Sequence, residues 1–410
     1  MTPSRRRFLE LSGLALAGVG GSPVAGGRKD SGRKESGRES AFDWPMARYD
    51  PAGTGHNPDA SGPKTDVELA WSHGATDWFL GTSSPIRRGE TVYAAGNGLV
   101  ALDAETGARQ FGHPGPYQSS PARVRSSVYT TDTLAVTAPS GVFGLNADGG
   151  VEVPVLNLSL GVERWEGPRS PGGGFFGAND SVTPVAADGS IYTAIPGTNA
   201  IAALDPNTGG VRWRRTHHED DAVGVDFNRP AVKDGLVFLT NWPRQATAYR
   251  TDTGARRWQR ELSEQLLLPP VATEEGVVVP SRNTVWLLDA DDGTTLWKHD
   301  HEGNATDGAP AVADGTVFFS DEQESLYALD LATGETVWTT PFDGPASPVV
   351  ADDTVYAVRS GFALLALDAA SGEQRFEYRP SQVPLSTPVV GDGVLYATNR
   401  RRVIALAAAA

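Results

Sequence analysis

The side chains of this sequence that could do chemistry are a recurring aspartate and seven histidines. The aspartate recurs in the pattern Ala-x-Asp-x-x-Thr-Gly-x-x-x-Trp, which is complete at residues 203–213 and 328–338. Carboxylates can bind metals or act as acids, but a single metal or catalytic site needs one set of residues at one place. This carboxylate instead recurs in successive repeats. Asp and Thr side chains also hydrogen-bond turn backbones, and Gly supplies a positive φ. We therefore interpret the aspartates as turn residues.

The histidines are the second candidate. His73, His113 and His299 each lie two residues after an aromatic residue that ends a repeat, and His217, His218 and His301 occupy the same kind of loop. A His-x-His spacing can place two imidazoles on one side of an extended segment, where they could bind zinc. We expect instead solvated loop residues of separate repeats that do not converge. No metal site is predicted.

Other catalytic chemistry has little support. The chain has no Cys, which excludes disulfides, thiolate metal sites, a Cys nucleophile and lipid attachment through Cys. The glycine run at residues 172–174 lacks the helix that a phosphate-binding loop needs. No catalytic residue is assigned, and we expect a protein that is not an enzyme.

The elements that position these residues are short strands. Each repeat reads as a Pro-led strand, two apolar strands and a strand that ends in an aromatic residue, over about 40 residues, which is typical of a propeller blade. The Pro markers are Pro85, Pro121, Pro184, Pro230, Pro270, Pro310, Pro348 and Pro388. The aromatic residues are Trp71, Phe111, Trp165, Trp213, Trp258, Trp297, Trp338 and Phe376.

The order of these markers predicts how the ring closes. Trp71 precedes the first Pro, whereas the last repeat, after Pro388, stops without an aromatic residue. Residues 67–71 should therefore supply the fourth strand of the C-terminal blade, which removes two exposed sheet edges. The fold prediction is an all-β, single eight-bladed β-propeller with four-stranded blades, closed by pairing of the N-terminal strand with the C-terminal blade.

One repeat departs from the pattern. Its motif begins at Gly141, but Pro154 stands where the aromatic residue is expected, and Trp165 follows later. We predict an insertion near residues 150–161, with Trp165 still in the outer strand.

The repeated motif resembles the pyrroloquinoline-quinone-type (PQQ-type) propeller repeat over residues 67–406. The resemblance implies that each Trp packs near the turn Gly of a neighbouring blade. It extends to quinone-dependent dehydrogenases, which hold a vicinal Cys pair and calcium, and to non-catalytic eight-bladed propellers such as the lipoprotein that helps assemble outer-membrane barrels. Because Cys is absent, we expect no cofactor and a binding or scaffold role. The alternatives are a quinone- or metal-dependent oxidoreductase (PQQ being the possible cofactor) and a hydrolase or lyase on the same scaffold.

The N-terminus carries an export pattern. Arg5, Arg6 and Arg7 precede an apolar run of small residues, which resembles a twin-arginine signal. We assign residues 1–25 to the signal, 26–43 to a disordered linker and 44–410 to the propeller. No stretch of the mature chain is apolar enough to span a bilayer. The expected location is extracellular or at the cell surface.

The net charge of the chain limits the classes of partner that it could bind. The net charge is −15, and residues other than 1–40 carry −19 because that segment contributes +4. With 30 Arg against 5 Lys, this composition is typical of proteins that work in high salt, as in a halophilic archaeon. It argues against nucleic acid. We expect a monomer that binds a protein or a cell-surface macromolecule.

Two long connections, which leave consecutive blades at Trp165 and Trp213, mark a candidate binding face. Propeller loops carry binding because the strands are committed to packing. The alternative is that both are surface insertions that the scaffold tolerates. The candidate residues are Arg169, Phe175, Phe176, Asp180, Arg214, Arg215, His217, His218 and Asp226.

Overall fold

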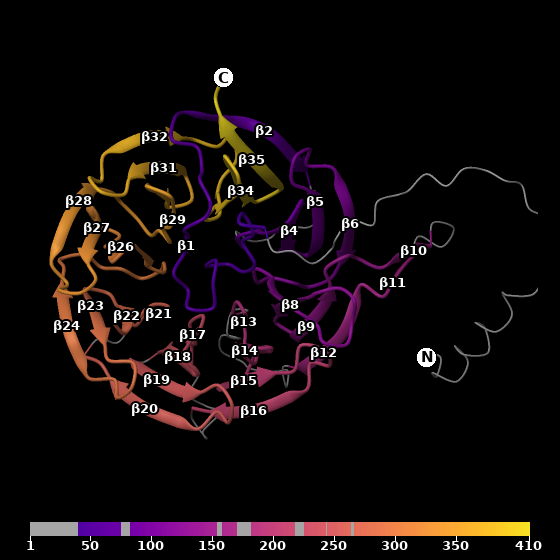
Figure 1. Cartoon of the computed structure of the whole chain (residues 1–410), viewed down its shortest axis with the longest axis horizontal. Coiled ribbons are helices and arrows are strands. Elements are labelled where there is room, and N and C mark those ends of the chain that lie inside the picture. Colours follow the sequence, from indigo (N-terminus) through magenta and orange to yellow (C-terminus); the bar gives the residue numbers. More distant parts are fainter. Residues whose placement is uncertain are drawn as a thin grey trace, which may run out of the picture. The chain divides into compact units, whose positions relative to one another are not determined.

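The computed structural model describes residues 40–74, 83–153, 158–169, 182–217, 225–242, 244–263 and 266–410. Within these ranges the regular elements are β-strands, and eight four-stranded antiparallel sheets follow one another around a ring (Figure 1). The prediction of an all-β, eight-bladed propeller is confirmed. In the part of the chain described, no helix is long and apolar enough to cross a membrane.

The first four blades follow the chain. Blades 1 and 2 are β3 (Ile86–Arg88), β4 (Thr91–Gly96), β5 (Gly98–Asp103) and β6 (Arg109–Pro114), then β7 (Ala122–Val124), β8 (Thr133–Ala138), β9 (Gly141–Asn146) and β12 (Glu163–Arg169). Blades 3 and 4 are β13 (Val185–Ala187), β14 (Ser190–Ala194), β15 (Ala200–Leu204) and β16 (Val211–Thr216), then β17 (Ala231–Lys233), β18 (Leu236–Asn241), β19 (Gln245–Arg250) and β20 (Arg256–Glu261).

The next three blades repeat the plan. Blades 5 and 6 are β21 (Val271–Ala272), β22 (Val277–Pro280), β23 (Thr284–Leu288) and β24 (Thr295–Asp300), then β25 (Ala311–Ala313), β26 (Thr316–Ser320), β27 (Ser325–Asp330) and β28 (Thr336–Pro341). Blade 7 is β29 (Val349–Ala351), β30 (Thr354–Arg359), β31 (Ala363–Asp368) and β32 (Gln374–Tyr378).

Blade 8 joins the two ends of the propeller. Its inner strands are β33 (Val389–Val390), β34 (Val394–Asn399) and β35 (Arg402–Ala408), and its outer strand is β2 (Val67–Gly74). β2 and β35 pair antiparallel, from Val67 opposite Ala408 to Gly74 opposite Arg402, and they lie side by side in Figure 1. The predicted closure is confirmed.

The insertion predicted in blade 2 is also present. β10 (Val151–Val153) and β11 (Leu158–Leu160) form a separate two-stranded hairpin, and Trp165 lies in the outer strand β12. Trp165 is opposite Gly144 and only 7% exposed. A Cβ at Gly144 would lie 2.0 Å from the indole, so glycine stands here, where most of the other repeats have alanine, and leaves room for the ring.

The repeated turns serve the roles expected for their residues. Asp330 Oδ1 accepts hydrogen bonds from the Thr333 N–H (2.8 Å) and hydroxyl (2.9 Å), and these bonds lower the pKa of Asp330. The Trp213 indole N–H donates to the Thr251 oxygen of the next blade (2.8 Å), and a Cβ at Gly254 would lie 2.6 Å from the ring. Gly254 has a φ of +64°, so glycine meets both the steric and the conformational demand. The same indole bond ties six of the blades to the next one, and blades 1 and 7 end in Phe instead.

Residues 44–61, the inner segment, were not predicted to pair with the blades. They lie inside the ring, where β1 (His56–Asn57) pairs parallel to β29 (Figure 1). Oxygens of this segment accept backbone N–H groups from the innermost part of seven blades. The pairs are Arg87 to Trp44, Arg123 to Pro45, Val232 to Pro51, Ala272 to Ala52, Val312 to Thr54, Val350 to Gly55 and Gly393 to Ser61.

Two buried arginines fasten the inner segment. Arg48 donates to the oxygens of Pro310 (2.6 Å) and Ser347 (3.3 Å), and Arg229 donates to the Asp50 oxygen (2.8 Å). Burial lowers the pKa of Arg48 to about 9 and that of Arg229 to about 10. Both guanidinium groups are therefore held by backbone carbonyls at the centre of the propeller.

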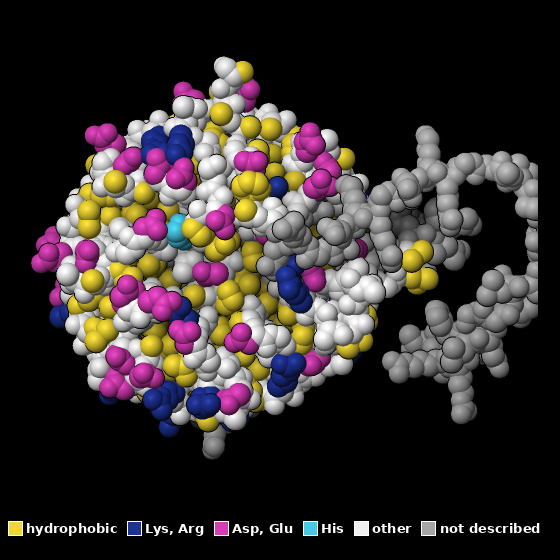
Figure 2. Space-filling model, in the orientation of Figure 1, with side chains coloured by type: hydrophobic (Ala, Val, Ile, Leu, Met, Phe, Trp, Pro, Cys, Tyr) yellow, Lys and Arg dark blue, Asp and Glu magenta, His cyan; other side chains and the backbone are white. Residues whose placement is uncertain are grey.

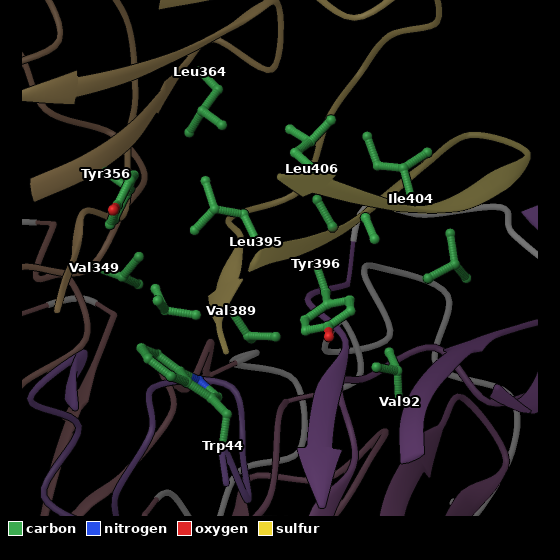
Figure 3. Close-up of a cluster of buried hydrophobic side chains, with 14 of the residues drawn as sticks. Trp44, Val92, Val349, Tyr356, Leu364, Val389, Leu395, Tyr396, Ile404 and Leu406 are labelled. Carbon is green, nitrogen blue, oxygen red and sulfur yellow. The ribbon is translucent and has the colours of Figure 1, made fainter. Parts of the chain in front are cut away.

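The largest apolar clusters join different blades. In the cluster of Figure 3, Trp44 of the inner segment lies near side chains of blades 1, 7 and 8, including Val92, Tyr356 and Tyr396. The Tyr356 hydroxyl donates to the Pro63 oxygen at 2.9 Å. The N-terminal part of the propeller is thus packed into its core as well as into its rim.

Candidate binding face

Two ends of the propeller follow from its topology. The turns between first and second strands and between third and fourth strands of each blade lie at one end, here called the turn end. The second-to-third-strand loops and the connections between blades lie at the other, called the loop end. The connections over residues 170–184 and 217–230 leave consecutive blades, after β12 and β16, at the loop end. Four of the nine candidate residues, Phe175, Phe176, Asp180 and His218, lie outside the described residues.

Arg169 and Arg214 are open to solvent. The Arg169 side chain, at the end of β12, is 73% exposed and pairs with Glu166. Arg214 is exposed in β16. Exposed ion pairs contribute little to stability, so neither arginine is needed for packing and both are free to meet a partner.

Arg215 and His217 are engaged at the junction of blades 3 and 4. The Arg215 guanidinium donates to the oxygens of Gly254 (2.6 Å) and Thr253 (2.7 Å) in the next blade. The His217 Nε2 lies 2.8 Å from the Tyr249 hydroxyl, and its ring packs edge-on against Phe227. The structure therefore gives these two candidates an inter-blade role.

Asp226 leads to a residue that the sequence analysis missed. Asp226 is exposed, and its carbonyl oxygen accepts the Trp242 N–H at 2.9 Å. Trp242 follows β18 in the second-to-third-strand loop, and its side chain is 44% exposed. Its position outside the blade-ending register was a partial signal, since Trp44 and Trp286 also lie outside that register and are buried.

A second apolar group lies at the same end. Phe362, in the loop between β30 and β31, is 61% exposed, and Val383, in the connection after β32, is 38% exposed. Gly361 and Pro384, their neighbours in the chain, line a cavity of about 270 Å³. Other lining residues are Asp307, Pro345, Ser360 and Thr387. The loop end thus combines exposed apolar side chains with a small polar hollow.

The histidines do not form a metal centre in the described part of the chain, where no group of three His, Asp or Glu side chains is placed to hold an ion. They pack at blade junctions instead: His299 lies edge-on to Tyr327, and His301 lies against Phe319. His301 is only 8% exposed, and burial lowers its pKa to about 4. The expectation that these histidines are solvated is therefore wrong for His301, because its ring packs against Phe319 and Tyr327 of the next blade.

Comparison with known proteins identifies the family. The family model described as outer membrane protein assembly factor BamB matches residues 197–307 and 281–410, which together span just over half of the chain. The outer membrane protein assembly factor BamB of Yersinia pestis is 29% identical over 205 residues, covering 45% of this chain and 51% of that protein. The chain spans about a third to a half of the length of such curated relatives.

Solved structures share the fold. BamB from Moraxella catarrhalis superposes with a TM-score of 0.60 at 15% identity, over 83% of this chain and 100% of that one. The quinohemoprotein alcohol dehydrogenase of Comamonas testosteroni gives a TM-score of 0.65 at 14% identity, over 90% and 81%. At these identities the likeness extends to the fold alone. The family match, the eight blades and the repeated Trp–Gly contacts together place this chain in the BamB-like family of PQQ-type repeat propellers.

Proposed function

We propose that this protein is an exported, non-enzymatic β-propeller that binds another protein or a cell-surface macromolecule through its loop end. The observation that carries the proposal is the exposure of Trp242 (44%) and Phe362 (61%), two large aromatic side chains in second-to-third-strand loops. Trp is among the residues that contribute most at protein interfaces, and exposed apolar patches mark interaction sites. Among the described residues, most other aromatic side chains are buried or partly buried, Tyr129 (40% exposed) being an exception.

The surroundings of Trp242 suit a protein partner. Asp226 lies beside it, and Arg169 and Arg214 are exposed on blades 2 and 3. Phe175 and Phe176 belong to one of the two long connections at this end. Aromatic anchors inside a polar, charged rim are the usual anatomy of a protein interface. The relatives named as assembly factors support the same class of function.

The residues present do not fit the quinone chemistry of the dehydrogenases that share the fold. Cys is absent, so a vicinal Cys pair cannot form. The described residues bring no three His, Asp or Glu side chains together for calcium, and the inner segment occupies the ring centre. We therefore propose no cofactor and derive no step that involves one.

Export is part of the proposal. The pattern around Arg5 and Arg6 supports the twin-arginine route, which carries folded proteins, as a closed ring would require. Replacing both arginines with Lys is expected to hold the precursor inside the cell. Recovery of the variant outside the cell at wild-type levels would remove the assignment.

Substitution of the two exposed aromatics tests the binding face. The pair Trp242→Ser and Phe362→Ser, made together, should lower recovery of a reproducible partner from the exported fraction in high salt by at least ~10-fold. Its Tm should shift by no more than about 2 °C, because neither side chain is buried. The control pair, Leu296→Ser and Val337→Ser, removes equally exposed side chains (51% and 55%) from the outer strands. Unchanged recovery with the loop-end pair would refute the proposed face.

A further inference from the structure

Blade 3 is the one blade that donates no backbone hydrogen bond to the inner segment among the described residues; in blade 8 the donor is Gly393, in the turn after β33. In blades 4, 5 and 6 the second residue of the first strand, Val232, Ala272 or Val312, donates its N–H to that segment. The corresponding residue in blade 3 is Ala186, the second residue of β13. The chain of the inner segment passes from Pro45, bonded to blade 2, to Pro51, bonded to blade 4.

The register shows where the backbone groups of Ala186 point. Ala186 is opposite Ile191, as Val232 is opposite Val237 and Ala272 opposite Val277. At this position of an antiparallel pair both backbone groups point away from the partner strand. The N–H and C=O of Ala186 therefore face the ring interior, and no described residue accepts the Ala186 N–H.

A cavity of about 520 Å³ lies at this gap. Its apolar lining includes Pro45, Met46, Val124 and Ala186, and its rim includes Arg125 and Asp188. An unpaired strand edge beside an apolar hollow has the two parts that bind an extended peptide: backbone groups for affinity and a pocket for a side chain.

The molecule itself shows what fits such an edge. In blade 1, Trp44 pairs with Arg87 through two backbone bonds, one in each direction, at 2.9 and 3.0 Å. In blade 7, His56 and Asn57 pair with Val350 and Ala351. In both places the occupant is a short extended peptide, which Figure 1 shows inside the ring at β1.

We infer that the open edge of β13 and the adjoining cavity form a peptide-binding site, in which one residue of an extended segment from a partner protein pairs with Ala186. Its apolar side chain enters the cavity beside Met46 and Val124. This site lies at the turn end, next to the turn at Asp188 and Gly189, and goes beyond the loop-end function proposed above.

Charge at the rim defines the preferred peptide. Asp43 accepts the Gly89 N–H, and Asp50 accepts the N–H groups of Gly53 and Thr54. Asp188 is exposed and has no ion-pair partner in the described part of the chain. A basic residue next to the apolar one would therefore pair with Asp188.

The test uses a library of acetylated, amidated pentapeptides with every apolar residue at the third position and Arg or Gln at the fourth. Fluorescence anisotropy with the full chain should find saturable binders, and Arg peptides should bind more tightly than Gln peptides. Methylation of the third backbone nitrogen, which removes the N–H that pairs with the Ala186 oxygen, should weaken the best binder at least ~10-fold. Absence of binding across the whole library would overturn the proposal.

Two matched substitutions separate the open edge from a paired one. Ala186→Pro removes an N–H that faces the cavity, a position where an edge strand tolerates Pro. It should leave Tm unchanged and weaken the best peptide at least ~10-fold. Ala272→Pro removes the bond to Ala52 (3.0 Å), so it should lower Tm and leave peptide binding unchanged.

Further outcomes identify which peptide occupies the edge of β13 or refute the peptide-binding site. Should Ala186→Pro fail to fold, Asp188→Asn provides the second variant: it should abolish the preference for Arg over Gln, and a retained preference would count against the site. Peptide binding only after removal of residues 1–39 would assign the edge to this chain's own N-terminal segment, and a dimer lost in Ala186→Pro would assign it to a second copy. Either result overturns the partner assignment. The Trp242→Ser and Phe362→Ser pair should leave peptide binding intact, so the two proposals can fail separately.

Discussion

The two ends of the propeller use similar residues in opposite ways. At the turn end, Trp213 buries its ring against Gly254 and donates its N–H to the next blade. At the loop end, Trp242 leaves 44% of its surface in solvent. The Trp that ends a blade serves the scaffold, whereas Trp242, an exposed Trp outside the repeat register, is available for a partner.

The difference extends to the polar groups. Turn-end aspartates such as Asp330 accept hydrogen bonds from the backbone N–H groups of their own turns. Figure 2 shows acidic side chains around the periphery of the face that it draws, with basic side chains between them. The loop end has long connections of unequal length, and Arg169, at the end of β12, is exposed there and has no packing role. Stability should therefore depend on the turn end and partner binding chiefly on the loop end.

Removal of the closing strand should have the largest effect, because both ends depend on the ring. Deleting residues 67–72 leaves the edge of β35 unpaired, and an unpaired apolar edge strand promotes aggregation. Size-exclusion chromatography should show aggregate in place of monomer. A monomeric deletion variant with wild-type Tm would show that the ring is held mainly by the inner segment.

A pair of Trp substitutions tests the comparison directly. Trp213→Ala removes a side chain that is 6% exposed, so unfolding free energy should fall by about 3–5 kcal/mol. Trp242→Ala should change it by less than ~1 kcal/mol. Urea unfolding at pH 7 measures both. Equal losses would mean that Trp242 is a packing residue, and the assignment of the loop end would lose its main support.

His301 gives the loop end a pH dependence. Its folded pKa of about 4 lies below the ordinary value of 6.5 because the ring is buried, so the unfolded chain binds the proton more strongly. The stabilisation is fully present above pH 6.5 and is lost as pH falls toward 4. Between pH 7 and pH 5 the wild type should lose about 1–2 kcal/mol more than His301→Gln. An identical loss in both would show that burial does not lower the pKa of His301 in the folded protein.

The exposed arginines should give the smallest effect on stability. Arg169→Ala and Arg214→Ala together should change unfolding free energy by less than ~0.5 kcal/mol, because surface charges contribute little. Partner association should slow, and its dependence on salt should weaken. A stability loss well above that limit, seen in urea unfolding, would place these residues in the scaffold.

The repeat explains what could be predicted from the sequence. The closure could be predicted because Trp71 precedes the first repeat and the repeat after Pro388 has no aromatic ending. The insertion could be predicted because Trp165 comes later than the aromatic position, where Pro154 stands. Such departures from the pattern can be recognised only because many other copies define it. The inner segment could not be predicted in this way. It makes single backbone bonds from a non-repeating chain, and residues such as Trp44 and Arg48 have no periodicity that indicates their burial.

The candidate site was predicted less completely for a related reason. Loop length identified the face that carries Arg169 and Asp226, but it could not distinguish a side chain that reaches solvent from one that reaches the next blade. Arg215 and His217 contact blade 4 because the outer strand of blade 3 leads directly to it. The repeat register narrows the aromatic candidates to those that do not end a blade, but it does not separate the exposed Trp242 from the buried Trp44 and Trp286.

Site-specific photo-cross-linking tests the central claim, that the loop end is the partner face, most directly. A photoreactive phenylalanine analogue would replace Trp242, Phe362 or, as a rim control, Val337, in cells grown at their native salt concentration. We predict the same cross-linked partner from positions 242 and 362 and none from 337. Cross-links from 337, with none from 242 or 362, would contradict the assignment.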